Sequence, residues 1–109
     1  MNKRTAICNY LKKYHTGKER AVYSEELGRL FSLSKRGIQH NVAVLRQRGQ
    51  PICSGVTGYF YAANQSEIDE TISRLESIIE SVSETKQAMR HTSAARTVSL
   101  KTTVQVKLR

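Results

Sequence analysis

The sequence predicts an α+β protein that is mainly α, and three observations lead to this fold class. Apolar residues recur at helical spacing through residues 2–48 and again through residues 66–89. Between these stretches, residues 52–62 contain two β-prone runs around a glycine-bounded loop. From residue 97 onwards, apolar and polar residues alternate with the period of a strand. The chain is therefore expected to have three parts: a domain of short helices and one β-hairpin, 1–63; a long, coiled-coil-like helix for oligomerisation, 64–89; and a basic, β-like tail, 90–109.

The net charge of the chain and its distribution predict the kind of partner. A chain of 109 residues allows one small domain and an appendage. Its formal net charge of +9 suggests a polyanionic partner or an acidic surface. Residues 1–63 hold eleven Lys and Arg against three Asp and Glu, residues 64–89 two against six, and residues 90–109 five against none. The basic charge therefore belongs to the first domain and the tail, and the long helix between them is acidic.

Several classes of protein are not expected from this composition. No stretch approaches the roughly 18 apolar residues of a membrane span, and no signal peptide precedes the first helix, so we expect a cytoplasmic protein without membrane contact. Cys8 and Cys53 lie 45 residues apart without a Cys-x-x-Cys motif, which argues against a disulfide scaffold and a zinc site. His15, His40 and His91 lack metal-ligand spacing, and no phosphate-binding loop or nucleophile motif is present. We therefore expect no enzyme, no metal and no cofactor.

Residues 2–14 are predicted to form the first helix. Ile7, Leu11 and Tyr14 share one face, and Cys8 lies beside it, where it is expected to be a small core residue and not a reactive thiol. The basic residues of this helix point away from that face: Lys3, Arg4, Lys12 and Lys13.

Two short helices joined by a tight turn are predicted within residues 24–48. Leu27, Leu30 and Phe31 give the first helix an apolar stripe, and Ser34 is placed to cap the second. The second helix turns three apolar residues inward: Ile38, Val42 and Leu45. It turns a polar and basic set outward: Lys35, Arg36, Gln39 and His40, with Ala43. This pattern is typical of a helix-turn-helix, whose second helix enters the DNA major groove, although an ordinary helical hairpin with a solvated outer face has it too.

A β-hairpin is predicted after the second of these helices. Gly49 and Pro51 end that helix, and two β-prone runs, residues 52–54 and 59–62, flank a four-residue loop bounded by glycines. Residues 21–23 are long enough to add a short third strand. Helix, helix-turn-helix and hairpin in this order make a winged-helix arrangement, which favours DNA binding over the ordinary helical hairpin.

Over residues 26–62 the chain resembles the winged helix-turn-helix domains of the biotin-repressor-like (type 11) family, which occur in bacterial and phage regulators. The resembling run is ELGRLFSLSKRGIQHNVAVLRQRGQPICSGVTGYFYA. These residues match in register: Glu26-Leu27, Ser34 before two basic residues, Ile38, Val42, Leu45-Arg46, Gly49, Pro51-Ile52 and Gly58-Tyr59. Two residues depart from the family pattern. Ser32 stands where glycine is usual, which predicts a backbone that is either strained or differently shaped in the turn, and Gly37 stands where threonine is usual.

The resemblance implies that the second helix reads bases and that neighbouring residues hold phosphates. Arg36 can take a guanine with two hydrogen bonds, Gln39 an adenine, and His40 can donate to a base or a phosphate. Lys35 suits the DNA backbone as well as a base. The DNA-binding residues expected on this helix and its cap are Ser34, Lys35, Arg36, Gln39 and His40. Phosphate contacts are expected from Lys12, Lys13, Ser54 and Thr57.

The long helix is expected to run from a cap at Ser66 to Met89, with the apolar spacing of a heptad. Its a positions are Ile72, Ile79 and Lys86, and its d positions are Ile68, Leu75, Val82 and Met89. Isoleucine at a with leucine or valine at d suits a parallel two-stranded coiled coil, although the same stripe can also pack onto the first domain. The residues expected to hold a homodimer together are Ile68, Ile72, Leu75, Ile79, Val82 and Met89.

The tail is expected in one of two states. Residues 97–109 alternate between two faces like a strand, with basic residues on one of them, and the chain offers them no partner strand. The tail therefore either pairs with a second copy or another protein, or stays disordered.

The function expected from these features is sequence-specific binding of double-stranded DNA by a dimeric transcriptional regulator of bacterial, phage or prophage type. The alternative is an adaptor of phage DNA packaging or replication, which binds DNA with the same domain and uses the long helix and tail to form oligomers and to dock a partner protein. A winged helix that binds protein in place of DNA is a third possibility.

Overall fold

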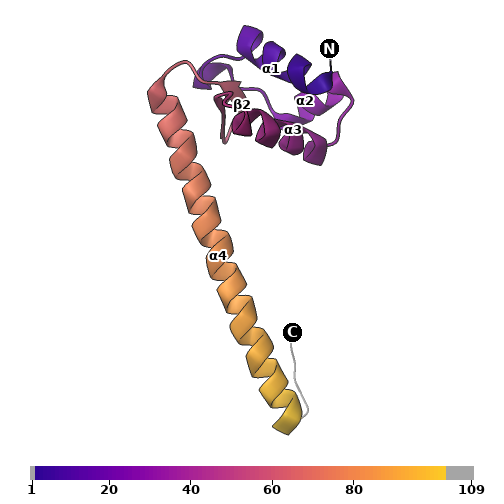
Figure 1. Ribbon diagram of the computed structural model, residues 1–109, viewed down its shortest axis with the longest axis vertical. Helices are drawn as coiled ribbons and strands as arrows, with labels where there is room; N and C mark the ends of the chain where they lie inside the picture. The colour runs from indigo at the N-terminus through magenta and orange to yellow at the C-terminus, as the bar shows by residue number, and fades with distance from the viewer. Residues whose placement is uncertain (1, 103–109) are drawn as a thin grey trace. The chain divides into compact units, whose positions relative to one another are not determined.

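The protein is α+β and mainly α, as predicted, in a computed structural model that describes the backbone of residues 2–102 and the side-chain surroundings of residues 2–92. The elements in order are α1 (Lys3–Tyr14), the 3-10 helix η1 (Lys18–Arg20), α2 (Ser24–Phe31), α3 (Lys35–Gln47), β1 (Ile52–Gly55), β2 (Gly58–Tyr61) and α4 (Gln65–Thr102) (Figure 1). The chain divides into two compact units, Met1–Arg74 and Leu75–Arg109. The first unit thus includes the opening turns of α4 and extends past the boundary predicted after residue 63.

The hydrophobic core of the first unit lies where α1, α2 and α3 meet. α1 begins after Asn2, whose side chain accepts a hydrogen bond from the Thr5 N–H at 2.8 Å and so caps the helix. Burial of a large apolar side chain stabilises a fold by about 1.5–3 kcal/mol. The residues predicted to point inward and found buried are Ile7, Cys8, Leu11, Leu27, Ile38, Val42 and Leu45.

Two residues of the predicted apolar stripes lie on the surface instead. Leu30 is 53% exposed and Tyr14 is 52% exposed. α2 is only eight residues long, and it reaches the core through buried Leu27 and half-buried Phe31, so Leu30 is left at the edge of the contact. Tyr14 lies on the last turn of α1 and packs its ring on Tyr10, at 5.3 Å between centroids.

The turn between α2 and α3 is strained, which is one of the two outcomes expected for Ser32. Ser32 adopts a left-handed conformation with φ of 55°, where glycine is the usual residue. A Cβ added to Gly28 would lie 2.6 Å from the Leu33 carbonyl oxygen, so this position of α2 must stay without a side chain. Ser34 caps α3 as predicted, because its Oγ accepts the Gly37 N–H at 3.0 Å.

The sheet is an antiparallel hairpin of β1 and β2, with Ile52 opposite Tyr61 and Gly55 opposite Gly58. The predicted third strand over residues 21–23 contributes a single bridge, in which Val22 and Tyr59 exchange two backbone hydrogen bonds of 2.9 and 2.8 Å. The hairpin therefore joins the loop before α2 to the rest of the unit.

The outer edge of β1 is covered within the first unit. The Ile52 carbonyl accepts a hydrogen bond from Arg46 Nε at 2.8 Å, and the Ser54 N–H lies 3.4 Å from Thr71 Oγ1 in α4. Capping these backbone groups leaves β1 a poor edge for the addition of a further strand.

The start of α4 differs from the predicted start of the long helix. α4 begins at Gln65, and its cap is Asn64, whose Oδ1 accepts the Glu67 N–H at 3.0 Å. The sequence predicts Ser66 as this cap. Asparagine is as good an N-cap as serine, so the choice depends on how the chain leaves β2 and not on residue type.

The end of α4 differs from the predicted end of the long helix by more than its start does. The prediction of a disordered or strand-forming tail is wrong for residues 90–102, because α4 continues to Thr102, and residues 103–109 lie outside the described residues. Neither glycine nor proline follows Gly58 in the sequence, so no residue of these types interrupts the helical hydrogen bonds. Within the described residues no helix, α4 included, combines the length and the apolarity of a membrane span.

Candidate nucleic-acid interface

The outward side of α3 gathers the residues that the sequence predicts as readers of DNA bases. Lys35, Arg36, Gln39 and His40 are all exposed, on the first two turns of the helix. The opposite side of α3 is buried in the core, which fixes the orientation of the outward side. In Figure 1, α3 runs along the lower side of the first unit and α1 along its upper side.

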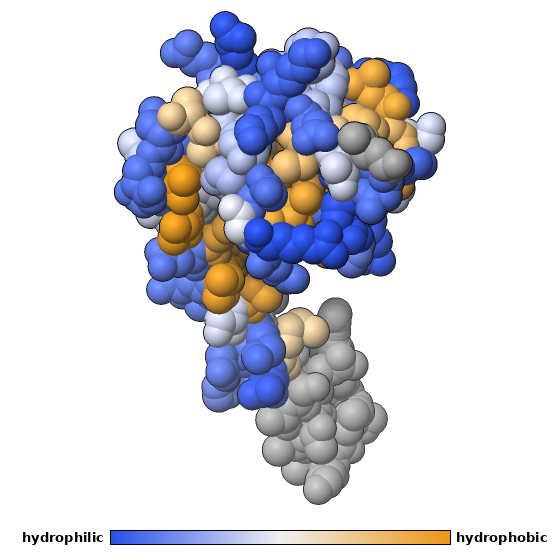
Figure 2. Space-filling view, turned by 45° about the horizontal axis from the view of Figure 1, so that its top comes forward, coloured by the Kyte–Doolittle hydropathy of each residue, from blue (hydrophilic) through white to orange (hydrophobic). Residues whose placement is uncertain are grey.

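Among residues 2–92, no carboxylate lies within ion-pair distance (4.0 Å) of the basic side chains on this side of α3. Among the residues whose side chains are described, one ion pair is shorter than 4.0 Å, between Lys18 and Glu70, and it includes no residue of α3. The first turn of α3 holds no acidic residue, so the partial positive charge of the helix N-terminus adds to Lys35 and Arg36. Figure 2 shows hydrophilic residues over much of the visible face of the first unit. The basic side chains of Lys35 and Arg36 and the N-terminus of α3 together form a positive region, and positive charge attracts phosphate groups.

Arg46, which the sequence does not single out for this surface, ties α3 to the hairpin. Its Nε donates to the Ile52 carbonyl at 2.8 Å, and its Nη2 donates to Ser54 Oγ at 3.1 Å. Burial lowers the pKa of the Arg46 guanidinium below its usual range, while the neighbouring Tyr59 and Cys53 act to raise it. No spacing rule separates Arg46 from exposed Arg48, so this role is visible only in the folded chain.

The two hairpin residues predicted to hold phosphates differ in their surroundings. Thr57 lies exposed in the turn between β1 and β2. Ser54 is half-buried, with its hydroxyl oxygen accepting from Arg46 and its N–H directed at Thr71. Ser54 thus has a structural role in holding the hairpin, and Thr57 is the more accessible of the two.

The predicted phosphate contacts from α1 lie at the other end of that helix from the turn before α3. Lys12 lies over the Tyr61 ring at 5.7 Å, next to the sheet, and Lys13 lies over the Tyr14 ring at 5.2 Å. The α1 cations that reach the turn and α3 are the two nearest its start: Lys3 donates to the Ser32 carbonyl at 3.3 Å, and Arg4 donates to Asn41 Oδ1 at 2.9 Å. Helical periodicity predicts the face of a residue but not which end of the helix meets a neighbour.

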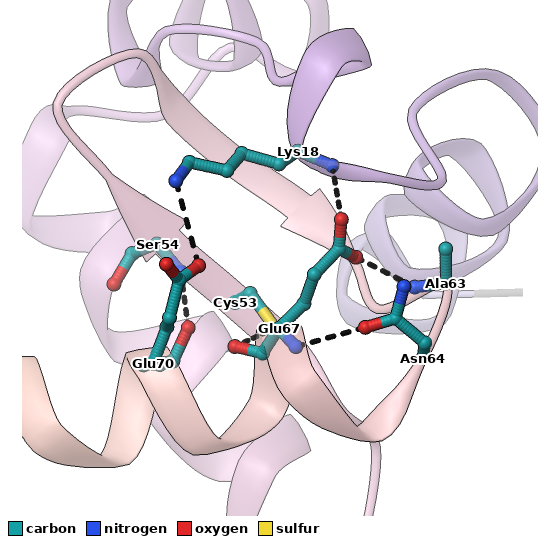
Figure 3. Close-up of polar contacts among 8 residues, drawn as sticks. Lys18, Cys53, Ser54, Ala63, Asn64, Glu67 and Glu70 are labelled. Atoms are coloured by element: carbon teal, nitrogen blue, oxygen red, sulfur yellow. Dashed lines mark hydrogen bonds and ion pairs between the residues drawn. The ribbon is translucent and has the colours of Figure 1, made fainter.

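A carboxylate clamp fixes the first turns of α4 to the hairpin and to η1, within the first unit (Figure 3). Glu67 accepts the Ala63 N–H at 2.8 Å with one oxygen and the Lys18 N–H at 2.9 Å with the other. These two backbone hydrogen bonds hold the pKa of Glu67 below its usual range. Cys53 adds a contact from its Sγ to the Glu67 carbonyl at 3.5 Å, and burial raises the pKa of this thiol.

We expect Glu67→Gln to destabilise the protein by about 1 kcal/mol, because it removes charge-assisted hydrogen bonds at a site partly open to solvent. A carboxyl whose folded pKa is depressed contributes stability above its unfolded pKa, and this contribution is lost as the pH falls through the folded value. Thermal unfolding measured from neutral to acidic pH should therefore show a smaller loss of stability on acidification in Glu67→Gln than in the natural protein. Glu80→Gln, at an exposed position of the same helix, is the control, and an equal effect of both substitutions would contradict the clamp.

The predicted oligomerisation residues of α4 differ in exposure along the helix. Ile68 and Leu75 are half-buried, and Ile72 is 48% exposed. Ile79, Val82 and Met89 are between 62% and 67% exposed. Large apolar side chains in a row on one helix face, each open to solvent, indicate a surface that a partner can cover.

No metal-binding cluster of three His, Cys, Asp or Glu side chains is found among the described residues. Cys8 and Cys53 are both buried free thiols.

In comparisons with protein-family models, curated protein sequences and solved structures, no match to the chain is found.

Proposed function

We propose that residues 1–63 form a winged helix-turn-helix domain of the biotin-repressor-like type and bind double-stranded DNA in a sequence-specific manner. In this proposal α2 and α3 are the helix-turn-helix, α3 enters the major groove, and the β1–β2 hairpin is the wing. One observation carries the proposal: Lys35, Arg36, Gln39 and His40 are exposed together on the first turns of a helix whose other side is fixed in the core. A helix presented in this way meets the geometric need of base reading.

The proposed contacts divide into base reading and phosphate holding. Arg36 reads a guanine and Gln39 an adenine, while His40 donates to a base or a phosphate. Lys35, Lys3 and Thr57 hold phosphates, and so does the N-terminus of α3, where Ser34 keeps the first turn in place. We propose that Lys3 takes the place first given to Lys12 and Lys13, because Lys3 lies against the turn before α3.

We propose a dimeric transcriptional regulator as the biological role, with binding and not catalysis as its activity and the cytoplasm as its location. The exposed apolar face of α4 supports an oligomer. The length of α4, which continues to Thr102, equally favours the second candidate, an adaptor of phage DNA packaging or replication that forms larger assemblies. The mass of the DNA-bound protein in solution separates the two, because a dimer supports the regulator and a ring supports the adaptor.

The salt dependence of DNA binding tests the proposal. If each protomer neutralises roughly five phosphates, log affinity should fall with log salt concentration at a slope of about −4.5 per bound protomer, which is about −9 for a dimer that binds through both of its domains. Lys35→Ala should lower the affinity and reduce the slope by about one per protomer, because it removes one phosphate contact from each. Arg74→Ala removes an exposed cation of α4 that lies outside α3 and at neither a core nor a flanking heptad position, and it should leave both unchanged. Weak binding with a shallow slope at low salt would contradict the DNA-binding role and favour a domain that binds protein.

A further inference from the structure

The exposed face of α4 carries charges whose order selects a direction of pairing. Over residues 69–92 the apolar residues open to solvent are Ile72, Ile79, Val82 and Met89, with Ile78 beside them. The same segment has acidic residues before residue 85 and basic residues after it, apart from Arg74. In the heptad of this face, Lys86 occupies a core a position, and Asp69, Glu76 and Arg90 occupy flanking e positions.

We propose that α4 pairs with α4 of a second copy in antiparallel orientation over residues 69–92, with the two-fold axis between Glu80 and Ser81. This inference rests on the proposed dimer and specifies its geometry. It replaces the parallel coiled coil that isoleucine at a and leucine or valine at d suggest on their own.

A parallel pair in register would place like charges together. Each a residue then faces the same residue of the other copy, so that Lys86 meets the partner's Lys86 within the core. The flanking positions give no compensation, because the g positions that face Glu76 and Arg90 are Thr71 and Thr85. The parallel pair thus desolvates two ammonium groups without an opposite charge, which is unfavourable.

The antiparallel pair places opposite charges together. In this register Ile79 faces the partner's Val82, and Ile72 faces the partner's Met89, so that each exposed apolar residue at a core position is covered by another. Lys86 lies level with the partner's Leu75 and one residue from the partner's Glu76, where its long side chain can reach the carboxylate. Asp69 and the partner's Arg90, both at e positions, lie within about two residues of the same level. Because the pair is two-fold symmetric, each of these contacts forms twice.

The exposure of the residues at the start of this segment fits the antiparallel register. Asp69, Ile72 and Glu76 are all exposed, although α4 is anchored to the hairpin through Glu67 and Thr71 at the same level of the helix. The side of α4 that the anchor leaves open is therefore the side that carries the charges and the isoleucine of the proposed contact.

Disulfide cross-linking of the full-length chain tests the orientation. Ile72→Cys and Met89→Cys are made as separate variants, one of them with an affinity tag, and oxidised alone and as an equal mixture. The antiparallel pair predicts a mixed disulfide between the two variants and little cross-linking of either alone, because the two Met89 positions lie about 25 Å apart along the axis. The natural protein, with its two buried cysteines, is the background control. Rapid cross-linking of Met89→Cys to itself would overturn the antiparallel pair and leave a parallel dimer.

Charge reversal gives a second readout that does not depend on oxidation. Asp69→Arg and Arg90→Asp should each weaken the dimer by about tenfold, and the double variant should recover most of the loss. In a parallel pair the two positions lie about 32 Å apart, so the double variant should recover nothing, and this result would contradict the proposal. If the natural protein is monomeric and still binds DNA with the expected salt slope, the proposed α4 pair is wrong, whereas the proposed DNA-binding function is retained.

Discussion

Gly58→Ala is expected to destabilise the protein by about 2–5 kcal/mol, from backbone strain and steric overlap together. Gly58 has φ of 115°, and a Cβ at this position would lie 2.1 Å from the Val22 carbonyl oxygen. Relief of the overlap requires the strand segment at Val22 to move away from β2, which breaks the two hydrogen bonds between Val22 and Tyr59. Because a small domain has a total stability of about 5–15 kcal/mol, thermal or urea denaturation should show the loss directly.

The matched control for this substitution is Gly55→Ala, in the same hairpin. Gly55 faces Gly58 across the turn, has an ordinary φ, and a Cβ there would meet no atom within 4 Å. We expect it to change stability by no more than about 0.5 kcal/mol. Equal unfolding temperatures for the two variants would contradict the close approach of the chain at Val22 to β2.

Arg36→Ala and Gln39→Ala are each expected to reduce discrimination between a selected DNA site and random DNA by about 1–3 kcal/mol, which is roughly 5–150-fold in affinity. Both side chains are exposed and neither contributes to the core, so the variants should fold normally. Loss of a bidentate contact to a base edge weakens binding to the chosen sequence, whereas binding to random DNA depends mainly on phosphates. Equilibrium binding to both DNAs at one salt concentration gives the ratio of the affinity for the selected site to the affinity for random DNA.

Lys3→Ala is the control that represents residues proposed to contact phosphates. Lys3 lies beside the turn before α3 and not on the outward face of α3. This substitution should weaken binding to both DNAs by the same factor. Equal losses on the two DNAs for Arg36→Ala and Gln39→Ala would assign these side chains to the phosphates and remove α3 from the reading role.

Local rules of sequence predicted much of the fold. The cap at Ser34 and the inward residues Ile38 and Val42 were readable because each depends on neighbours a few residues away, whereas the strained turn at Ser32 was expected from the family resemblance. The structure of the segment after residue 89 could not be predicted in this way. Its alternation suits a strand, but a strand needs a partner and a helix makes its own hydrogen bonds, so α4 continues to Thr102.

The sequence predicted the part of the candidate interface that α3 forms, but not the contacts that α1 and the hairpin add to it. The outward residues of α3 follow from helical periodicity alone, as their exposure shows. The link from Arg46 to the hairpin and the approach of Lys3 to the turn join elements distant in sequence, and no local pattern encodes them. The charge of Lys12 predicted a phosphate contact, but its position beside Tyr61 depends on how α1 crosses the other helices.

Selection of bound sequences from a pool of random double-stranded DNA tests most directly the central claim that the outward face of α3 reads bases. We predict that the natural protein enriches a defined motif and that Arg36→Ala enriches the same motif with the preference lost at one guanine. Lys3→Ala should enrich the unchanged motif with lower yield. A pool that binds the natural protein and stays random, or a motif that neither Arg36→Ala nor Gln39→Ala alters, would contradict the claim.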